Sequence, residues 1–157
     1  MKKSLAVWLL AFTVFACDDA APFPFTTSDY LVFGAFAGEC YGDCLASFRV
    51  MNKRLEEDTT NQYYRYDYEF RADRELSSDA FEKAKVLMDD LPADLIRSDL
   101  DSYGCPDCAD QGALFLMFEQ AGEQRIIVLD SRDTDDQSAA IVAYKDRLQE
   151  LILELRE

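Results

Sequence analysis

The sequence predicts a single α+β domain: an antiparallel sheet of about five strands with two helices packed on one face. Three observations lead to this fold class. A chain of 157 residues has the length of one domain rather than two. Apolar residues make up 49% of it, which is enough for one hydrophobic core. Their spacing changes along the chain between a period of two and one of three to four, which predicts the order strand, strand, strand, helix, strand, strand, helix.

Three strands are expected before the first helix. Residues 30–37 are apolar at both odd and even positions, as in a strand covered on both faces, and Gly34 within them indicates a bulge or a close backbone approach. Residues 46–51 alternate like a half-buried strand. Residues 64–70 alternate strictly, with an aromatic side chain at every second position. We expect these aromatic side chains to be core beneath the helices; a face that stacks a carbohydrate or another ligand is the alternative.

Two helices are expected, each with a recognisable start. Asp79 and Glu82 have the spacing of a capping box, and Pro92 ends the helix that follows. Thr134 is expected to cap the second helix, with Gln137 at its third position. The apolar stripes comprise Phe81, Ala84, Met88 and Leu91 in the first helix and Ile141, Tyr144, Leu148, Leu151 and Leu155 in the second. Each helix therefore has one face to bury.

A hairpin is expected between the two helices. Residues 114–119 and 125–130 flank a four-residue turn in which Gly122 suits the left-handed position. Hairpin connections, together with the lack of strand–helix–strand alternation, favour an antiparallel sheet with its helices on one face.

The first 16 residues have the pattern of an export signal. Two lysines precede ten apolar residues at positions 5–14, a run too short to cross about 30 Å of hydrocarbon. The run ends in Val-Phe-Ala-Cys at residues 14–17. This tetrapeptide resembles the lipobox of bacterial lipoproteins. The resemblance implies cleavage before Cys17 and acylation of that cysteine, which would anchor the chain in the lipid bilayer.

An ordinary signal peptide, cut after Ala16, Ala20 or Ala21, is the alternative. The number of cysteines favours lipidation, because five thiols in an exported protein leave one unpaired. If Cys17 is acylated, the other four can pair. Lipidation would place the protein outside the cytoplasm at the bacterial cell envelope, in the periplasm or on the cell surface.

Removal of residues 1–16 would leave a tether and a domain. Residues 17–28 contain two prolines and no helical period, so we expect an extended tether, and residues 29–157 form the single domain. The chain has 16 basic and 31 acidic residues, a formal charge of −15. Such a surface repels anionic lipid headgroups, so attachment would depend on the acyl chains rather than on the domain.

Composition excludes several kinds of function. The absence of histidine removes Ser-His-Asp and Cys-His nucleophiles and every His-ligated metal or haem site. The acidic balance argues against a nucleic-acid partner, because phosphates are neutralised by a basic face. We find no Gly-rich phosphate loop and no convincing nucleophile, so we assign no catalytic residue, cofactor or metal.

Four cysteines form two closely spaced pairs, Cys40 with Cys44 and Cys105 with Cys108, each directly before an expected strand. Structural disulfides are the favoured interpretation, because export exposes the thiols to an oxidising compartment. Three pairings are open. Local pairing closes loops of four or five residues, and chain entropy gives such a loop roughly 2 kcal/mol of stabilisation. The two crossed pairings span about 65 residues and would each contribute about 4 kcal/mol.

Two other interpretations of these cysteines remain. Cys105-Pro-Asp-Cys108 has the form of a thiol–disulfide exchange site, although the expected order of elements places a strand after it rather than a helix whose N-terminus would lower the pKa of the thiol. All four cysteines could instead bind zinc, since their spacings fall within the range of four-cysteine zinc sites. The oxidising compartment favours disulfides over both.

The segments Cys-Tyr-Gly-Asp-Cys at residues 40–44 and Gly-Cys-Pro-Asp-Cys-Ala-Asp at residues 104–110 resemble those of small exported bacterial lipoproteins. The resemblance covers most of residues 29–155 and implies an exported α+β domain, without an activity or a catalytic residue. We therefore expect a membrane-anchored, extracytoplasmic module that binds or scaffolds an envelope protein or ligand and is not an enzyme. Thiol–disulfide exchange at Cys105 and Cys108, or zinc binding, is the alternative.

Overall fold

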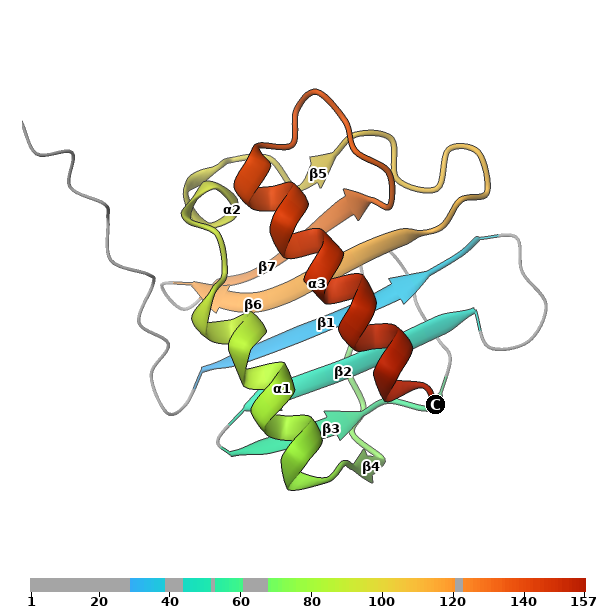
Figure 1. The fold of residues 1–157 in the computed structure, drawn as a ribbon, viewed down its shortest axis with the longest axis vertical. Helices are drawn as coiled ribbons and strands as arrows, with labels where there is room; N and C mark the ends of the chain where they lie inside the picture. The colour runs from blue at the N-terminus through green and yellow to red at the C-terminus, as the bar shows by residue number, and fades with distance from the viewer. Residues whose placement is uncertain (1–28, 39–43, 52, 61–67, 121–122) are drawn as a thin grey trace, which may run out of the picture.

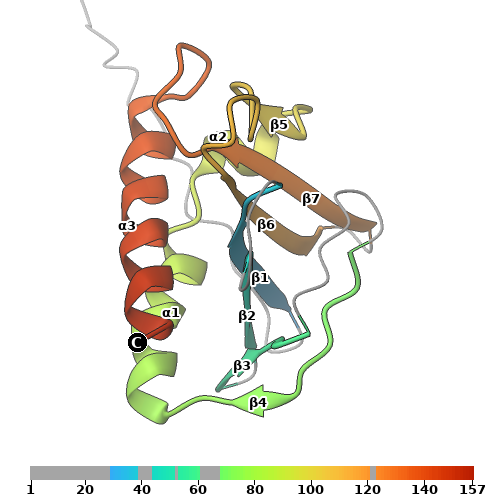
Figure 2. The same ribbon diagram turned by 90° about the vertical axis from the view of Figure 1, so that its right-hand side faces the viewer.

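The strands and helices form two layers, a sheet on one side and two long helices on the other (Figures 1 and 2). The computed structural model describes residues 29–38, 44–51, 53–60, 68–120 and 123–157. The strands are β1 (Tyr30–Phe36), β2 (Leu45–Met51), β3 (Arg54–Glu57), β4 (Arg74–Glu75), β5 (Ser102–Tyr103), β6 (Ala113–Gln120) and β7 (Glu123–Asp130). The helices are α1 (Ser78–Asp89), α2 (Ala93–Arg97) and α3 (Ala139–Leu155).

The sheet is larger than the sequence predicts, and it is mixed. About five antiparallel strands are expected, whereas the described residues form seven in the order β4-β3-β2-β1-β6-β7-β5. Strand β5 runs parallel to β7, with Ser102 opposite Val128. Strands β4 and β5 have two residues each, too few for a periodic pattern to predict them. The α+β class is confirmed, and α1 and α3 do lie on one face of the sheet (Figure 2).

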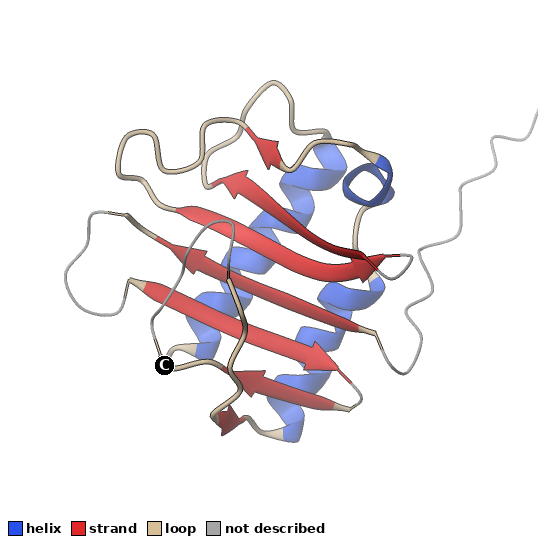
Figure 3. Ribbon diagram, turned by 180° about the vertical axis from the view of Figure 1, so that it is seen from behind, coloured by secondary structure: helices blue, strands red, loops and turns tan. Residues whose placement is uncertain are grey.

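The prediction of a strand at residues 64–70 is wrong for residues 68–70, the part of it that the structure describes. Residues 61–67 lie outside the described residues, and Tyr68 and Phe70 belong to no strand. Both side chains pack in an apolar cluster that includes Val32 and Phe115 and contains no residue of a helix. The backbone before β4 passes over the sheet face opposite the helices, which is the face toward the viewer in Figure 3. The expectation that they lie beneath the helices is therefore also wrong. An alternating pattern shows that one side of a segment is buried, but not whether that segment is hydrogen-bonded into the sheet.

Both long helices begin at a serine rather than at the residue that the sequence predicts. The Ser77 hydroxyl accepts the N–H of Ala80 at 3.2 Å and caps α1, which places Asp79 in the first turn. The Ser138 hydroxyl accepts the N–H of Ile141 at 3.3 Å and caps α3. Thr134, the expected cap, instead begins a separate turn before the helix. Serine, threonine and aspartate are all good N-cap residues, so the sequence alone did not show which of them caps each helix.

Apolar clusters cover both faces of the sheet. The larger one fills the space between the sheet and the helices, and its largest buried side chains include Phe33, Phe48, Phe118 and Tyr144. The smaller one lies on the opposite face. Strands β1 and β6 contribute to both, which confirms that residues of the first strand are covered on both sides. Gly34 lies where a Cβ atom would come within 2.5 Å of the Phe115 ring, so the expected close approach is confirmed.

Several predictions fall on residues outside the described ranges. They are the export signal at residues 1–16, the tether at 17–28 with Cys17, the residue Cys40 and the left-handed Gly122. Among the described helices, none combines the length and apolar character that crossing a bilayer requires.

Candidate functional site

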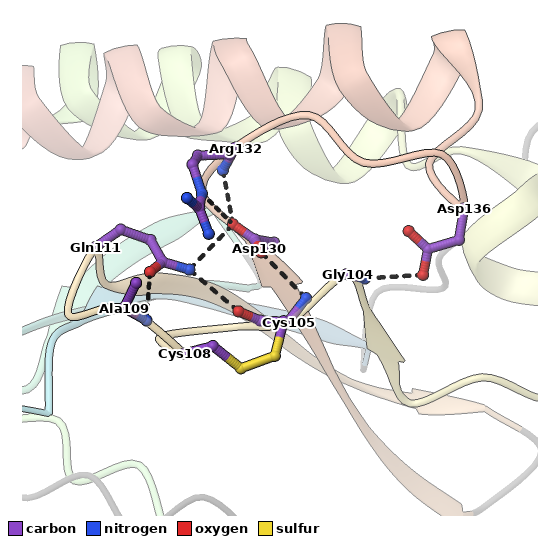
Figure 4. The surroundings of a disulfide bond; sticks show 8 residues. All are labelled: Gly104, Cys105, Cys108, Ala109, Gln111, Asp130, Arg132 and Asp136. Atoms are coloured by element: carbon purple, nitrogen blue, oxygen red, sulfur yellow. Dashed lines mark hydrogen bonds and ion pairs between the residues drawn. A yellow bond between two sulfur atoms is a disulfide. The ribbon is translucent and has the colours of Figure 1, made fainter.

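The Cys105–Cys108 loop, residues 104–112, connects β5 to β6 at the end of the sheet where β7 finishes (Figure 4). The two cysteines are disulfide-bonded, with Cα atoms 5.5 Å apart. The N–H of Cys108 donates to the carbonyl of Cys105 at 3.2 Å, so the intervening residues form a tight turn. Both cysteines are exposed. The structure therefore has the local Cys105–Cys108 disulfide, which excludes both pairings that would join the two cysteine segments.

The second cysteine pair is described in part. Cys44 precedes β2 and is also disulfide-bonded, with a partner outside the described residues. Its carbonyl accepts the N–H of Ala37 at 3.0 Å, which continues the pairing of β1 with β2.

Asp130, the last residue of β7, is hydrogen-bonded to two residues of the Cys105–Cys108 loop, Cys105 and Gln111. Its side chain is 2% exposed. One carboxylate oxygen accepts the N–H of Cys105 at 3.0 Å, and the other accepts the N–H of Arg132 at 2.9 Å (Figure 4). The side-chain amide of Gln111 donates to the same carboxylate at 3.3 Å and to the carbonyl of Cys105 at 3.1 Å.

These donors lower the pKa of Asp130. Burial is the largest influence and by itself would raise the pKa, because the charged form loses solvation. The N–H groups of Arg132 and Cys105, the amide of Gln111 and the Arg132 guanidinium together outweigh it. The pKa of the carboxyl therefore lies below its ordinary value of 3.8, and Asp130 is an anion at neutral pH.

Asp136 holds the start of the loop. Its carboxylate accepts the N–H of Gly104 at 2.8 Å and the hydroxyl of Thr134 at 2.5 Å, and both contacts lower its pKa. Gly104 has a φ of +72°, and a Cβ atom there would come within 2.7 Å of Asp130 and Thr134. Glycine is therefore required on both conformational and steric grounds.

Asp107 connects the loop to the end of β1. Its carboxylate accepts the N–H of Gly38 at 2.7 Å and that of Gly112 at 2.9 Å. Gly38 follows β1 and precedes the segment that contains the other cysteine pair. Asp107 thus brings two segments together that are far apart in the sequence.

The arrangement around the disulfide stabilises a loop conformation more than it activates a thiol. The residues after Cys105 form a turn and then continue toward β6, so Cys105 does not stand at the start of a helix as the first cysteine of an exchange site does. The carboxylate that binds the N–H of Cys105 adds negative charge, which disfavours a thiolate. No group of three or more possible metal-binding side chains occurs among the described residues.

A hollow, separate from the Cys105–Cys108 loop, lies on the sheet face that carries no helices. It has a volume of about 260 Å³, and its lining includes Tyr30, Val32, Arg49, Phe70, Met117 and Gln124. Three strands supply its centre, because Val32 on β1 lies opposite both Arg49 on β2 and Met117 on β6. The aromatic residues at 68 and 70 were the only part of this hollow that the sequence indicated.

Compared with protein-family models and with curated proteins, the chain matches none. The resemblance to bacterial lipoproteins stays a prediction from residues 14–17 and the two cysteine segments.

Proposed function

We propose that this protein is an exported bacterial lipoprotein, anchored through acylated Cys17, whose domain is a non-catalytic binding or scaffolding module of the envelope. The supporting observation is the disulfide between Cys105 and Cys108. Both residues are exposed, so a reducing compartment would open the bond, whereas an oxidising one preserves it. An exposed disulfide therefore fits a chain that its N-terminal signal exports to an oxidising compartment.

A non-catalytic role is supported by the use of the carboxylates around the disulfide. Asp107, Asp130 and Asp136 each accept at least one backbone N–H, and together they hold residues of the Cys105–Cys108 loop. The pKa values of Asp130 and Asp136 are lowered by these hydrogen bonds, so these two carboxylates are poor proton acceptors at neutral pH. They stabilise the shape of a surface, which a binding module needs.

Metabolic labelling with an alkyne-bearing fatty acid in an expressing bacterium tests the anchor. We expect the wild-type chain to be labelled and to sediment with membranes, and the Cys17→Ser variant to be unlabelled and soluble. A Cys105→Ser/Cys108→Ser variant is the matched control, because it removes two thiols but retains Cys17. Labelling that persists in Cys17→Ser would contradict lipidation at this residue.

Thiol–disulfide exchange is the second candidate, and the exposure of both Cys105 and Cys108 favours it. In that reaction the reduced Cys105 thiolate attacks a substrate disulfide and releases one substrate thiol. Cys108 then displaces the second thiol, so two electrons pass to the substrate and the Cys105–Cys108 disulfide forms. Reduction of insulin by dithiothreitol tests this candidate. We expect no acceleration over the uncatalysed rate, and an acceleration lost in Cys105→Ser would establish exchange instead.

Zinc binding requires the reduced form of the four cysteines. Its test is the metal content of the exported protein, purified without a reductant. We expect less than stoichiometric zinc, because disulfide-bonded sulfur does not provide the thiolate ligand. One zinc per chain, lost when Cys108 is replaced by Ser, would favour the metal site.

A further inference from the structure

The hollow on the helix-free face of the sheet combines apolar and aromatic surface. Val32 and Met117 are buried neighbours on β1 and β6. Tyr30 and Phe70 are half-buried, so each presents part of its ring to solvent. The Arg49 guanidinium lies 4.7 Å from the centre of the Phe70 ring, which stabilises the position of both side chains. Ligand sites typically have such an apolar lining with a few polar groups.

Polar groups with unused hydrogen-bonding capacity line the same hollow. Arg49 donates through Nε and one terminal nitrogen to Glu56, and its other terminal nitrogen has no partner in the described part of the chain. The Tyr30 hydroxyl accepts from the amide of Gln124 at 3.3 Å and retains its own proton as a donor. The side-chain carbonyl oxygen of Gln124 accepts no hydrogen bond from the described part of the chain. The hollow therefore offers donors and acceptors side by side.

The charges at the hollow favour a neutral ligand. Arg49 is paired with Glu56 at 2.6 Å, so its positive charge is compensated. The side chain of Glu69, which also lines the hollow, is 81% exposed, and the whole chain has a formal charge of −15. An anionic ligand would be repelled by this surface, and Glu69 is paired with Arg71 at 3.8 Å, so a cation finds no unpaired carboxylate in the described lining of the hollow.

We propose that this hollow binds one ring of a neutral saccharide, an assignment that rests on the proposed binding function and specifies its ligand. A sugar ring has an apolar C–H face that stacks on an aromatic ring, here Phe70 or Tyr30. Its hydroxyl groups both donate and accept, which matches Arg49, the Tyr30 hydroxyl and Gln124. A volume of about 260 Å³ is just below the roughly 300 Å³ at which small-molecule sites begin, so a single ring fits better than a chain.

Protein-detected NMR titration of the exported Cys17→Ser full chain tests this proposal. The probes are N-acetylglucosamine and methyl glucoside as neutral sugars, with glucuronate and glucosamine as an anionic and a cationic sugar. We expect saturable shifts with at least one neutral sugar, at a dissociation constant on the order of 1 mM, centred on the amides of Val32 and Met117. Both charged sugars should bind at least about fivefold more weakly.

Three variants locate the site. Phe70→Ala removes an aromatic face, while Gln124→Ala and Tyr30→Phe remove polar groups at the surface with little effect on folding. We expect each to weaken binding, by about tenfold for Phe70→Ala. Phe81→Ala, which removes a half-buried ring on α1, is the matched control and should bind like the parent chain.

Any of three results would overturn the proposal: no saturable shift with either neutral sugar, tighter binding of a charged sugar, or unchanged affinity in both Phe70→Ala and Gln124→Ala. The proposed envelope function fails by a different measurement. Absence of fatty-acid labelling in the wild-type chain, or labelling that persists in Cys17→Ser, would contradict the anchor whatever the sugars do. Absence of sugar binding would leave the labelling of the wild-type chain unchanged.

Discussion

Asp107 and Gly38, which are 69 positions apart, are joined by a hydrogen bond of 2.7 Å from the glycine N–H to the carboxylate. The other carboxylate oxygen accepts the N–H of Gly112 at 2.9 Å, so one side chain bridges the disulfide loop and the end of β1. Asp107 itself has a φ of +59°, in the left-handed region that aspartate tolerates better than most residues. Asp107 therefore holds the Cys105–Cys108 loop against the end of β1.

Replacing Asp107 by alanine should destabilise the domain by about 1–3 kcal/mol, because two backbone N–H groups lose their acceptor. Urea denaturation measures the change. Asp110→Ala is the matched control: Asp110 also has a positive φ, +53°, but it is exposed and accepts no hydrogen bond among the described residues. The control isolates the backbone strain of alanine in this conformation. Equal destabilisation in both variants would show that the bridge contributes nothing.

Asp130→Asn should lower the free energy of unfolding at pH 7 by about 2 kcal/mol, because the neutral amide keeps only one acceptor oxygen and turns an NH2 group toward one of the two backbone N–H donors. The pKa of Asp130 is lowered in the folded state, so the charged carboxylate stabilises folding above its ordinary pKa of 3.8. That contribution is lost as the pH falls from 3.8 through the folded pKa. The difference between wild type and variant should thus shrink below pH 3.8.

Denaturation at a series of pH values from 7 downwards measures this difference. The comparison with the variant is needed because the pKa of Asp58 is also lowered, so the wild type loses stability in acid for more than one reason. Burial would raise the pKa of Asp58, but hydrogen bonds from Thr60, Arg71 and Tyr68 outweigh it. A difference between the two proteins that stays constant with pH would contradict the role assigned to Asp130.

The Cys105→Ser/Cys108→Ser variant should retain the fold and lose about 2 kcal/mol of stability, the amount that chain entropy gives for so short a loop. The hydrogen bonds from Asp107, Asp130 and Asp136 hold the loop independently of the disulfide. Circular dichroism and thermal denaturation measure both effects. Loss of the folded state at about 25 °C would show that the disulfide is essential to the fold.

Gly34→Ala should destabilise the sheet by about 1–3 kcal/mol, because a Cβ atom would meet the Phe115 ring and the carbonyl of Ala46. Gly34 lies between β2 and β6 in the middle of the sheet, where the backbone cannot move away easily. Phe115→Leu in the same background should recover part of the loss by removing the ring atoms. A neutral Gly34→Ala substitution would contradict this, because both the Phe115 ring and the Ala46 backbone would then have to move without cost.

The residues of the candidate site show why sequence analysis found only part of it. The four cysteines were singled out from the sequence, but their spacing left three disulfide pairings, thiol–disulfide exchange and zinc binding open, and the structure has the local Cys105–Cys108 bond. The sequence did not predict that Asp107 and Asp130 hold the disulfide loop, since an aspartate that accepts distant N–H groups has the same local sequence as one in solvent. The parallel strand β5 was missed for a related reason: its two residues are stabilised by β7, not by their own pattern.

The sequence by itself determined the α+β class, the helix stripes, the hairpin and the cysteine pairs, because periodicity, turn residues and short spacings are local properties. Tertiary structure decided which cysteines of the described chain are bonded, which face Tyr68 and Phe70 cover, and how Asp107 and Asp130 connect the loop to the sheet. These depend on contacts between distant segments, whose energies arise only when the chain has closed the intervening loops.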